Sequence, residues 1–417
     1  MKVIITGGGF ANKGAEAMLL ATADAIRRRI PEAAIHAHVN DEDSASAKGA
    51  GLRPTKSALF SRRWAAPFKH LSSIGAFLTA DCVLDVGGYQ FGDIWGPISA
   101  QRKERILRWA VPARTKICYL PQAWGPFESP TLLRAVRGIV NRADLCYARD
   151  EVSLRWLQQA AGSQSGHVKA GTDVAWTFAG LPRQEARRVL ENSGALQSGR
   201  PIVAVTPNFG MAYRAGAGWT LANPYLRMLR DIIDCLTTYC NAHVLLIGHF
   251  YLSDAQKDDR RVCGELLTLV SNKPDVTFLS GHYSAAQIKG ILGNCAVVLS
   301  SRYHALIAAL SQGVPSIAFG WAHKYEALLE EVGTPQNCIQ LDTNLVEVQE
   351  RLTSILETRE TMANAIRGRA SKLVDAAHGQ FDEVTELMLG VGRSNKTDYR
   401  KQRNMRTDAP SESLKKT

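Results

Sequence analysis

Residues 296–319 read AVVLSSRYHALIAALSQGVPSIAF, and this stretch decides the fold. The apolar run Ala296–Leu299 predicts a strand that is buried on both faces. An Ala- and Leu-rich segment follows and predicts a helix, which Gly313 and Pro315 end before a second buried strand at Ser316–Phe319. Two buried strands joined by a helix indicate a parallel sheet with helices on its faces.

The same alternation of short apolar runs and helical patterns continues on both sides of this unit. Further strands are expected at Val3–Thr6, Ile35–Val39, Cys82–Val86, Lys116–Leu120, Leu145–Ala148, Pro201–Val205, Val244–Ile247 and Val276–Leu279. The pattern weakens between Phe178 and Gly199, where a Gly-Leu-Pro turn, a charged helix and a Ser-Gly pair mark a domain boundary. Each half therefore predicts its own parallel sheet.

The predicted fold class is α/β, with two Rossmann-like domains facing a cleft. The first domain is expected over residues 1–180 and the second over 198–345. Terminal helices are expected over 346–390 and a disordered basic tail over 391–417. Because ligands of such sheets bind beyond the carboxyl ends of the strands, functional side chains are expected in the loops that follow strands.

The composition fits a folded chain of this size. Its 417 residues are 45% hydrophobic and 21% charged, which excludes a disordered chain, a collagen and a small disulfide scaffold. The net charge is +11, but residues 393–417 hold eight basic and three acidic residues and so account for five of these charges. The modest excess on the remaining body does not indicate a nucleic-acid partner.

The cysteines and the N-terminal sequence indicate the cellular compartment in which the protein is expected. The eight cysteines include no Cys-x-x-Cys pair and stand mostly in apolar runs, so free cysteines in a reduced core are expected. Met1 is followed at once by a strand pattern, without the features of a signal peptide. The sequence therefore predicts a soluble, cytoplasmic protein.

The loop after the first strand, Thr6-Gly7-Gly8-Gly9-Phe10-Ala11-Asn12, brings three glycines to the start of a helix. Gly8, Gly9 and Asn12 are candidate substrate contacts, because glycine backbones approach a ligand closely and helix N-termini favour anions. The loop matches neither the dinucleotide fingerprint nor the P-loop. A tight strand-to-helix turn without a ligand is the alternative.

Two more loops, Asp85–Asp93 and Pro121–Phe127, follow predicted strands and are expected at the same rim. Within the first of them, Asp93 is a candidate catalytic residue that orients a sugar hydroxyl or accepts its proton. The alternative is that its carboxylate only caps the next helix.

The densest group of polar side chains lies in the second half. Arg302 and His304 follow one buried strand at the start of an apolar helix, and His323 and Lys324 follow the next strand. Two cations, two imidazoles and free helix N–H groups in one small volume suit a compact, highly charged anion. His304 taken alone also fits an ordinary histidine at a helix N-terminus.

This block, S-S-R-Y-H-A-L-I-A-A-L-S-x-G-V-P from Ser300 and G-W-x-H-K-Y from Gly320, resembles the signature of the polysaccharide pyruvyl transferase family. The N-K-G-A-E-A segment from Asn12, the D-V-G-G-Y-Q-F-G-D and P-Q-A-W-G-P-F turns, and R-D-E-x-S from Arg149 also resemble family segments, in family order. The resemblance spans residues 1–333. One departure is Tyr89, which stands where the family often has a third glycine.

The resemblance implies a GT-B-like architecture and the transfer of a pyruvyl group from phosphoenolpyruvate to two hydroxyls of a sugar, giving a cyclic ketal and phosphate. The reaction requires no cofactor and no metal. The family's R-x-H motif carries over to Arg302 as a phosphoenolpyruvate ligand and to His304, which we interpret as the general acid. A second arginine is expected from the loop after the second domain's first strand, where Arg214 is the candidate and a solvated loop arginine the alternative. The glycan acceptor, free or lipid-linked, is expected on the first domain.

Two other functions compete with this interpretation. A GT-B glycosyltransferase that uses a nucleotide sugar is the nearest, but the E-x7-E pair of many such enzymes has no counterpart among Glu326, Glu330 and Glu331. A non-catalytic sugar-binding relative is the other, and the intact set of Arg302, His304 and Lys324 argues against it.

A basic and aromatic segment raises the hypothesis of peripheral contact with the inner face of a membrane. It comprises Arg53, Lys56, Arg62, Arg63, Trp64, Phe68, Lys69 and His70. A solvated basic loop and helix is the alternative.

Overall fold

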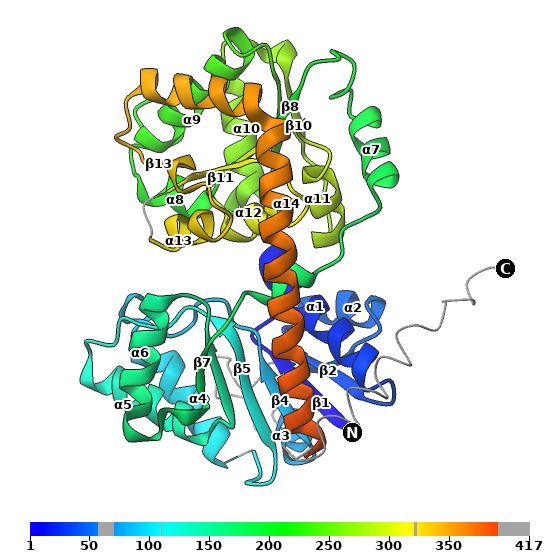
Figure 1. Cartoon of the computed structure of the whole chain (residues 1–417), viewed down its shortest axis with the longest axis vertical. Coiled ribbons are helices and arrows are strands. Elements are labelled where there is room, and N and C mark those ends of the chain that lie inside the picture. Colours follow the sequence, from blue (N-terminus) through cyan, green and yellow to red (C-terminus); the bar gives the residue numbers. More distant parts are fainter. Residues whose placement is uncertain (57–70, 110, 321–322, 391–417) are drawn as a thin grey trace, which may run out of the picture.

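A computed structural model describes residues 1–56, 71–109, 111–320 and 323–390, and shows two α/β domains stacked along the long axis (Figure 1). The strands of the first domain are β1 (Lys2–Thr6), β2 (Ala34–Val39), β3 (Arg53–Lys56), β4 (Cys82–Asp85), β5 (Lys116–Gln122), β6 (Leu145–Ala148) and β7 (Val168–Ala170). Its helices are α1 (Lys13–Arg29), α2 (Ser44–Gly49), α3 (Leu71–Leu78), α4 (Pro97–Trp109), α5 (Pro130–Arg142) and α6 (Glu151–Ala161).

The second domain follows a short 3-10 turn, η6 (Val174–Thr177), and the helix α7 (Arg183–Asn192). Its strands are β8 (Ile202–Thr206), β9 (His243–Ile247), β10 (Val276–Leu279), β11 (Val297–Ser300), β12 (Ser316–Phe319) and β13 (Cys338–Ile339). Its helices are α8 (Phe209–Arg214), α9 (Pro224–Thr238), α10 (Asp259–Leu269), α11 (Ala285–Leu292), α12 (Tyr303–Leu310), α13 (His323–Glu331) and α14 (Leu345–Leu389).

Both sheets are parallel and doubly wound. The first has the order β3-β2-β1-β4-β5-β6-β7, and the second the order β10-β9-β8-β11-β12-β13. The strand order reverses between β1 and β4 in one sheet and between β8 and β11 in the other. Open α/β sheets bind ligands at such reversals, so the fold provides one crevice from each domain.

The two crevices face each other because the loops that leave β1 and β9 are hydrogen-bonded. The Tyr251 N–H donates to the carbonyl of Ala11 at 2.9 Å, and the Lys13 N–H donates to the carbonyl of His249 at 3.1 Å. At the start of α1, the buried Glu16 carboxylate also accepts from the backbone N–H of Ala285 at 3.0 Å. The cleft predicted from the sequence is therefore closed at one point by backbone contacts between the domains.

The prediction of a two-domain α/β fold is confirmed, with two differences of detail. The edge strands β3, β7 and β13 were missed because they are only two to four residues long. One helix, α14, replaces the several terminal helices expected over 346–390. It runs along both domains (Figure 1), packing Leu352 into the core of the second and Phe381 into that of the first.

Part of the basic and aromatic segment belongs to the first sheet. Arg53–Lys56 forms β3, in which Thr55 is buried, instead of the start of a solvated loop. Residues 57–70 of this segment and the predicted tail at 391–417 lie outside the described residues. Nowhere in the described ranges does a helix combine the length and the apolar character that a membrane crossing requires.

All eight cysteines are free, and six of them are buried, as the sequence predicted.

Candidate functional site

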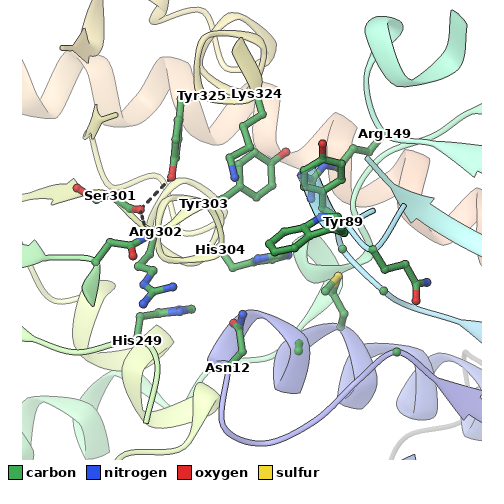
Figure 2. A pocket seen from close by; sticks show the side chains of 18 residues that line it. Asn12, Tyr89, Arg149, His249, Ser301, Arg302, Tyr303, His304, Lys324 and Tyr325 are labelled. Atoms are coloured by element: carbon green, nitrogen blue, oxygen red, sulfur yellow. Dashed lines mark hydrogen bonds between the residues drawn. The ribbon is translucent and has the colours of Figure 1, made fainter. Parts of the chain in front are cut away.

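A cavity of about 410 Å³, the central cavity, lies where the two crevices meet (Figure 2). Loops of the first domain contribute Gly7, Asn12, Gly87, Gly88, Tyr89, Gln90 and Arg149. The second domain contributes Asn208, His249, Ser301, Arg302, Tyr303, His304, Lys324 and Tyr325. In Figure 2, His304 stands between Arg302 and His249 on one side and Tyr89 and Arg149 on the other.

Arg302 is fixed by a buried carboxylate. It occupies the N-cap position of α12, and its Nε donates to Oδ2 of Asp259 at 2.9 Å while Nη2 donates to Oδ1. Asp259 is fully buried and also accepts the backbone N–H groups of Phe209 and His249, at 2.9 and 3.0 Å. A carboxylate with four donors holds the guanidinium in one orientation, with its charge at the cavity wall.

His304 belongs to the second domain but is held by the first. Its Nε2 lies 3.3 Å from Oδ2 of Asp173, whose side chain is 2% exposed and follows β7. The ring packs against Gly14 in α1, where any Cβ would come within 2.3 Å of it. Burial raises the pKa of Asp173, but the nearby His304 and Arg149 outweigh it and lower the pKa below its ordinary value. Asp173 is therefore a buried carboxylate beside the imidazole and holds the ring in place.

Arg149 provides a second buried guanidinium. Its side chain is 3% exposed, Nη1 lies 3.4 Å from Oδ2 of Asp173, and the guanidinium carbon lies 4.3 Å from the centre of the Tyr303 ring. Its buried Nε has no hydrogen-bond partner among the described residues. An unpaired buried donor costs about 1–3 kcal/mol, a cost that an anionic ligand in the cavity removes.

Lys324 completes the cationic set. It is the second residue of α13. Its Nζ lies 5.2 Å from the centre of the Tyr325 ring and 5.9 Å from that of the Tyr303 ring. Burial, with the repulsion of Arg149, Arg302 and Arg214, lowers the pKa of Lys324 to about 8. An anion beside Lys324 offsets the repulsion from these arginines and stabilises the charged form of the amine.

Neutral side chains hold the strand exits in place. Figure 2 shows the Tyr325 hydroxyl donating to the carbonyl of Ser301, at 2.9 Å, and Asn208 Nδ2 donates to the same carbonyl at 3.2 Å. Burial raises the pKa of Tyr325 to about 12, so the phenol stays protonated. Burial and three nearby cationic side chains lower the pKa of His249 well below its ordinary value, so it contributes a neutral imidazole.

The structure brings together four of the nine predicted site residues: Arg302, His304, Lys324 and Asn12 all line the central cavity. Asn12 also caps α1, since its Oδ1 accepts the Gly14 N–H at 3.0 Å.

Of the other five, four lie outside the central cavity and one has no described side chain. Gly8 lines a smaller neighbouring cavity, and a Cβ there would come within 2.8 Å of Leu19, as in a tight strand-to-helix turn. Gly9 does not line the central cavity, and Arg214 is an exposed residue of α8 that acts on Lys324 only through its charge. The side chain of His323 lies outside the described part of the structure.

Asp93 also lies outside the central cavity. Its carboxylate oxygens accept the backbone N–H groups of Glu128 and Ser129, at 2.7 and 3.1 Å, just before α5. The carboxylate therefore holds the loop before α5, whose own N-cap is Ser129, and this is neither the acid–base role nor the cap of the next helix that the sequence offered.

Sequence reasoning did not assign a role to Arg149, Asp173, His249 or Asp259. Arg149 directly follows β6, and His249 follows β9 after one glycine, so the rule that functional residues follow strands pointed to both. Asp173 follows a three-residue strand that the pattern did not predict. In the parts of the chain that the structure describes, no group of three or more His, Cys, Asp or Glu side chains is placed to hold a metal ion.

Fold and cavity together define a two-domain GT-B-like α/β protein with a cavity between its domains that is lined by cationic side chains. A model of the polysaccharide pyruvyl transferase family matches residues 12–323, three quarters of the chain, and the chain belongs to this family. The amylovoran biosynthesis protein AmsJ of Erwinia amylovora is 19% identical over 309 residues, which are 70% of this chain and 73% of that protein.

Solved structures resemble the chain in fold alone. The MnaA–UDP structure from S. aureus has a TM-score of 0.62 at 10% identity and covers 94% of this chain and 97% of its own. HepE of Anabaena in complex with UDP has a TM-score of 0.60 at 15% identity, covering 93% and 100%. The UDP-GlcNAc 2-epimerase of Neisseria meningitidis has a TM-score of 0.58 at 11% identity, also covering 93% and 100%. These likenesses confirm the GT-B-like architecture.

Proposed function

We propose that this polysaccharide pyruvyl transferase takes its pyruvyl group from phosphoenolpyruvate and forms a ketal on two hydroxyls of a sugar. The acceptor belongs to an exopolysaccharide or cell-surface glycan, or to its lipid-linked precursor. The observation that carries the proposal is the meeting of Arg149, Arg302, Lys324 and His304 in one cavity. Phosphoenolpyruvate carries its phosphate and its carboxylate on the same carbon atom, so a single small ligand offers two anionic groups to the cations around this cavity.

The charges of the site suit such a ligand. Asp173 and Asp259, which lie behind the cavity wall, are both paired with its cations. Guanidinium groups bind phosphate and carboxylate oxygens through parallel hydrogen bonds, each contributing about 1.5–3 kcal/mol when charged. Arg149 and Arg302 approach the cavity from different domains, so one ligand can join both.

The chemistry then needs one group that gives and takes a proton. The imidazolium of His304 donates a proton to the methylene carbon of phosphoenolpyruvate, and the first sugar hydroxyl attacks the cationic second carbon. The hydroxyl proton returns to the imidazole. The bond from the second carbon to the phosphate oxygen breaks, and the second hydroxyl closes the ring and gives its proton to the departing phosphate. One ketal and one hydrogen phosphate result, and His304 ends as it began.

Ligand protection against thermal unfolding tests this choice of donor. We expect phosphoenolpyruvate to raise the melting temperature of the protein, because a ligand of the native state stabilises it by mass action. UDP-glucose and GDP-mannose are the comparison ligands, since structural neighbours contain UDP. Protection by a nucleotide sugar and none by phosphoenolpyruvate would instead support a glycosyltransferase.

The proposed location of this activity is the cytoplasm, where phosphoenolpyruvate is made and thiols stay reduced. The eight free cysteines support this location. The basic and aromatic residues between Arg53 and His70 support contact with an anionic membrane, where a lipid-linked acceptor resides. Flotation of the purified protein with phosphatidylglycerol vesicles tests this contact, and absence of the protein from the floated fraction would end the idea.

A further inference from the structure

We propose that a second cavity beside the central one binds the acceptor sugar, as a neutral hexose unit. This acceptor chamber has a volume of about 570 Å³ and shares Tyr89, Arg149 and Lys324 with the central cavity. The inference rests on the proposed function, because it takes the central cavity as the donor site.

The acceptor chamber lies between the domains. On the first domain it is lined by the start of α6, from Asp150 to Arg155, and by Gly171 after β7. On the second it is lined by Ala327, Glu330 and Glu331 of α13. Figure 1 shows α6 and α13 on the same side of the molecule, across the gap between the domains. A ligand here sits next to the donor and touches both halves of the protein.

The walls of the acceptor chamber suit a sugar. Small and apolar side chains, including Ala123, Val152 and Ala327, offer surface for the C–H faces of a ring, while Glu151, Glu330 and Glu331 offer acceptors for hydroxyls. With Asp150 these glutamates offset the three cations of the lining, Arg149, Arg155 and Lys324, whereas the described residues that line the central cavity include cations but no carboxylate. A phosphate-bearing ligand is therefore favoured less here than in the central cavity. A neutral, hydroxyl-rich molecule is compatible with both features.

Glu331 has the protonation behaviour that hydroxyl recognition needs. Partial removal from water, with the nearby carboxylate of Asp173, raises the pKa of Glu331 to about 7, although Arg149 opposes the shift. Near neutral pH such a carboxyl is present in both forms. It therefore accepts a hydrogen bond in one form and donates in the other, as a sugar hydroxyl also does.

A competing cavity of about 250 Å³ adjoins the central one on its other side, through Gly7 and Gln90. Two of its polar side chains already have partners: Lys103 donates to Thr6 at 3.0 Å, and Thr6 donates to the buried Asp85 at 2.6 Å. Side chains already paired in this way offer less to a ligand than the glutamates of the acceptor chamber.

Ligand-observed NMR with methyl α- and β-hexopyranosides of the galacto, gluco and manno series tests the proposal without phosphoenolpyruvate. We expect at least one glycoside to bind the wild-type protein. Ala327→Phe, which fills the acceptor chamber, should remove this binding, and Glu331→Gln should weaken it by about tenfold, the loss of a charged hydrogen bond. Ser99→Phe, which fills the competing cavity, is the matched control and should leave the binding unchanged.

Protection by phosphoenolpyruvate against thermal unfolding, measured on the same variants, shows that each is folded and that its donor site is intact. Absence of glycoside binding by the wild type overturns the proposal, as does binding that survives Ala327→Phe or disappears in Ser99→Phe. Failure of phosphoenolpyruvate to protect the wild type would refute the donor assignment instead, because glycoside binding is measured without it.

Discussion

Replacing Asp173 by Asn removes one charge from beside His304 and keeps the size of the side chain. Asp173 Oδ2 lies 3.3 Å from Nε2 of the imidazole and 3.4 Å from Nη1 of Arg149. The low pKa of Asp173 reflects these cations, against the effect of burial. Asp173 is therefore a buried carboxylate between the ring of His304 and the guanidinium of Arg149, and it holds both groups in position. The neutral amide in the Asp173→Asn variant keeps the shape but loses the negative charge, so both groups are held less firmly.

The magnitude follows from the charge that is lost. A hydrogen bond or close ion pair to a charged group contributes about 1.5–3 kcal/mol, and about 1.4 kcal/mol corresponds to a factor of ten in rate. If the carboxylate orients His304 for proton transfer, Asp173→Asn should lower kcat by roughly 10- to 150-fold. The loss should appear at saturating phosphoenolpyruvate, because it concerns the proton donor and not the occupancy of the site.

Initial rates of phosphate release from phosphoenolpyruvate, measured at saturating phosphoenolpyruvate with the acceptor glycan, provide the assay. Asp258→Asn is the matched control, because Asp258 is also fully buried and paired with an arginine, Arg260, at 2.6 Å, but its partner does not line the cavity. Its kcat should stay unchanged. A wild-type kcat in Asp173→Asn would show that the carboxylate does not position His304.

Three further outcomes are expected. Gly14→Ala should reduce kcat by roughly 100-fold, because a Cβ 2.3 Å from the His304 ring displaces this acid by about 1 Å. Gly379→Ala is the control: its Cβ meets nothing within 4 Å, so steady-state rates should stay unchanged. Affinity for phosphoenolpyruvate, measured by calorimetry, should weaken above about pH 8, because Lys324 loses its charge there. Lys324→Arg should remove this pH dependence, since arginine stays charged. A wild-type affinity that stays constant from about pH 7 to 9.5 would contradict the role of the Lys324 amine. Phe381→Ala should lower the free energy of unfolding by about 3–5 kcal/mol in urea titrations, because this fully buried ring packs α14 on the first domain. A loss below about 1 kcal/mol would show that the packing of α14 does not depend on Phe381.

Much of the fold could be predicted because buried parallel strands leave a strong pattern in sequence. Every predicted strand corresponds to an observed one, and the strand-exit rule led to Arg302, His304, Lys324 and Asn12. Edge strands leave a weaker pattern, because they are short and partly exposed. Asp173 was missed for this reason, since it follows the edge strand β7.

Contacts between the domains are not visible in a local pattern at all. The packing of His304 on Gly14 joins residues about 290 positions apart, and no periodicity records it. The role of Asp93 had the same difficulty. A loop carboxylate before a helix suggests catalysis or capping of that helix, whereas its two bonds join it to the loop before α5, which is distant in sequence.

The most direct test of the central claim is the fate of the carbon atoms of phosphoenolpyruvate. Phosphoenolpyruvate labelled with ¹³C at all three carbons is incubated with the purified protein and the acceptor glycan, and the glycan is analysed by mass spectrometry while free phosphate is measured. We predict that the glycan gains all three labelled carbons as a ketal, with one phosphate released for each, and that His304→Ala gives neither product. An unlabelled glycan with no phosphate released, or a glycan that instead gains a hexose from a nucleotide sugar, would contradict the account.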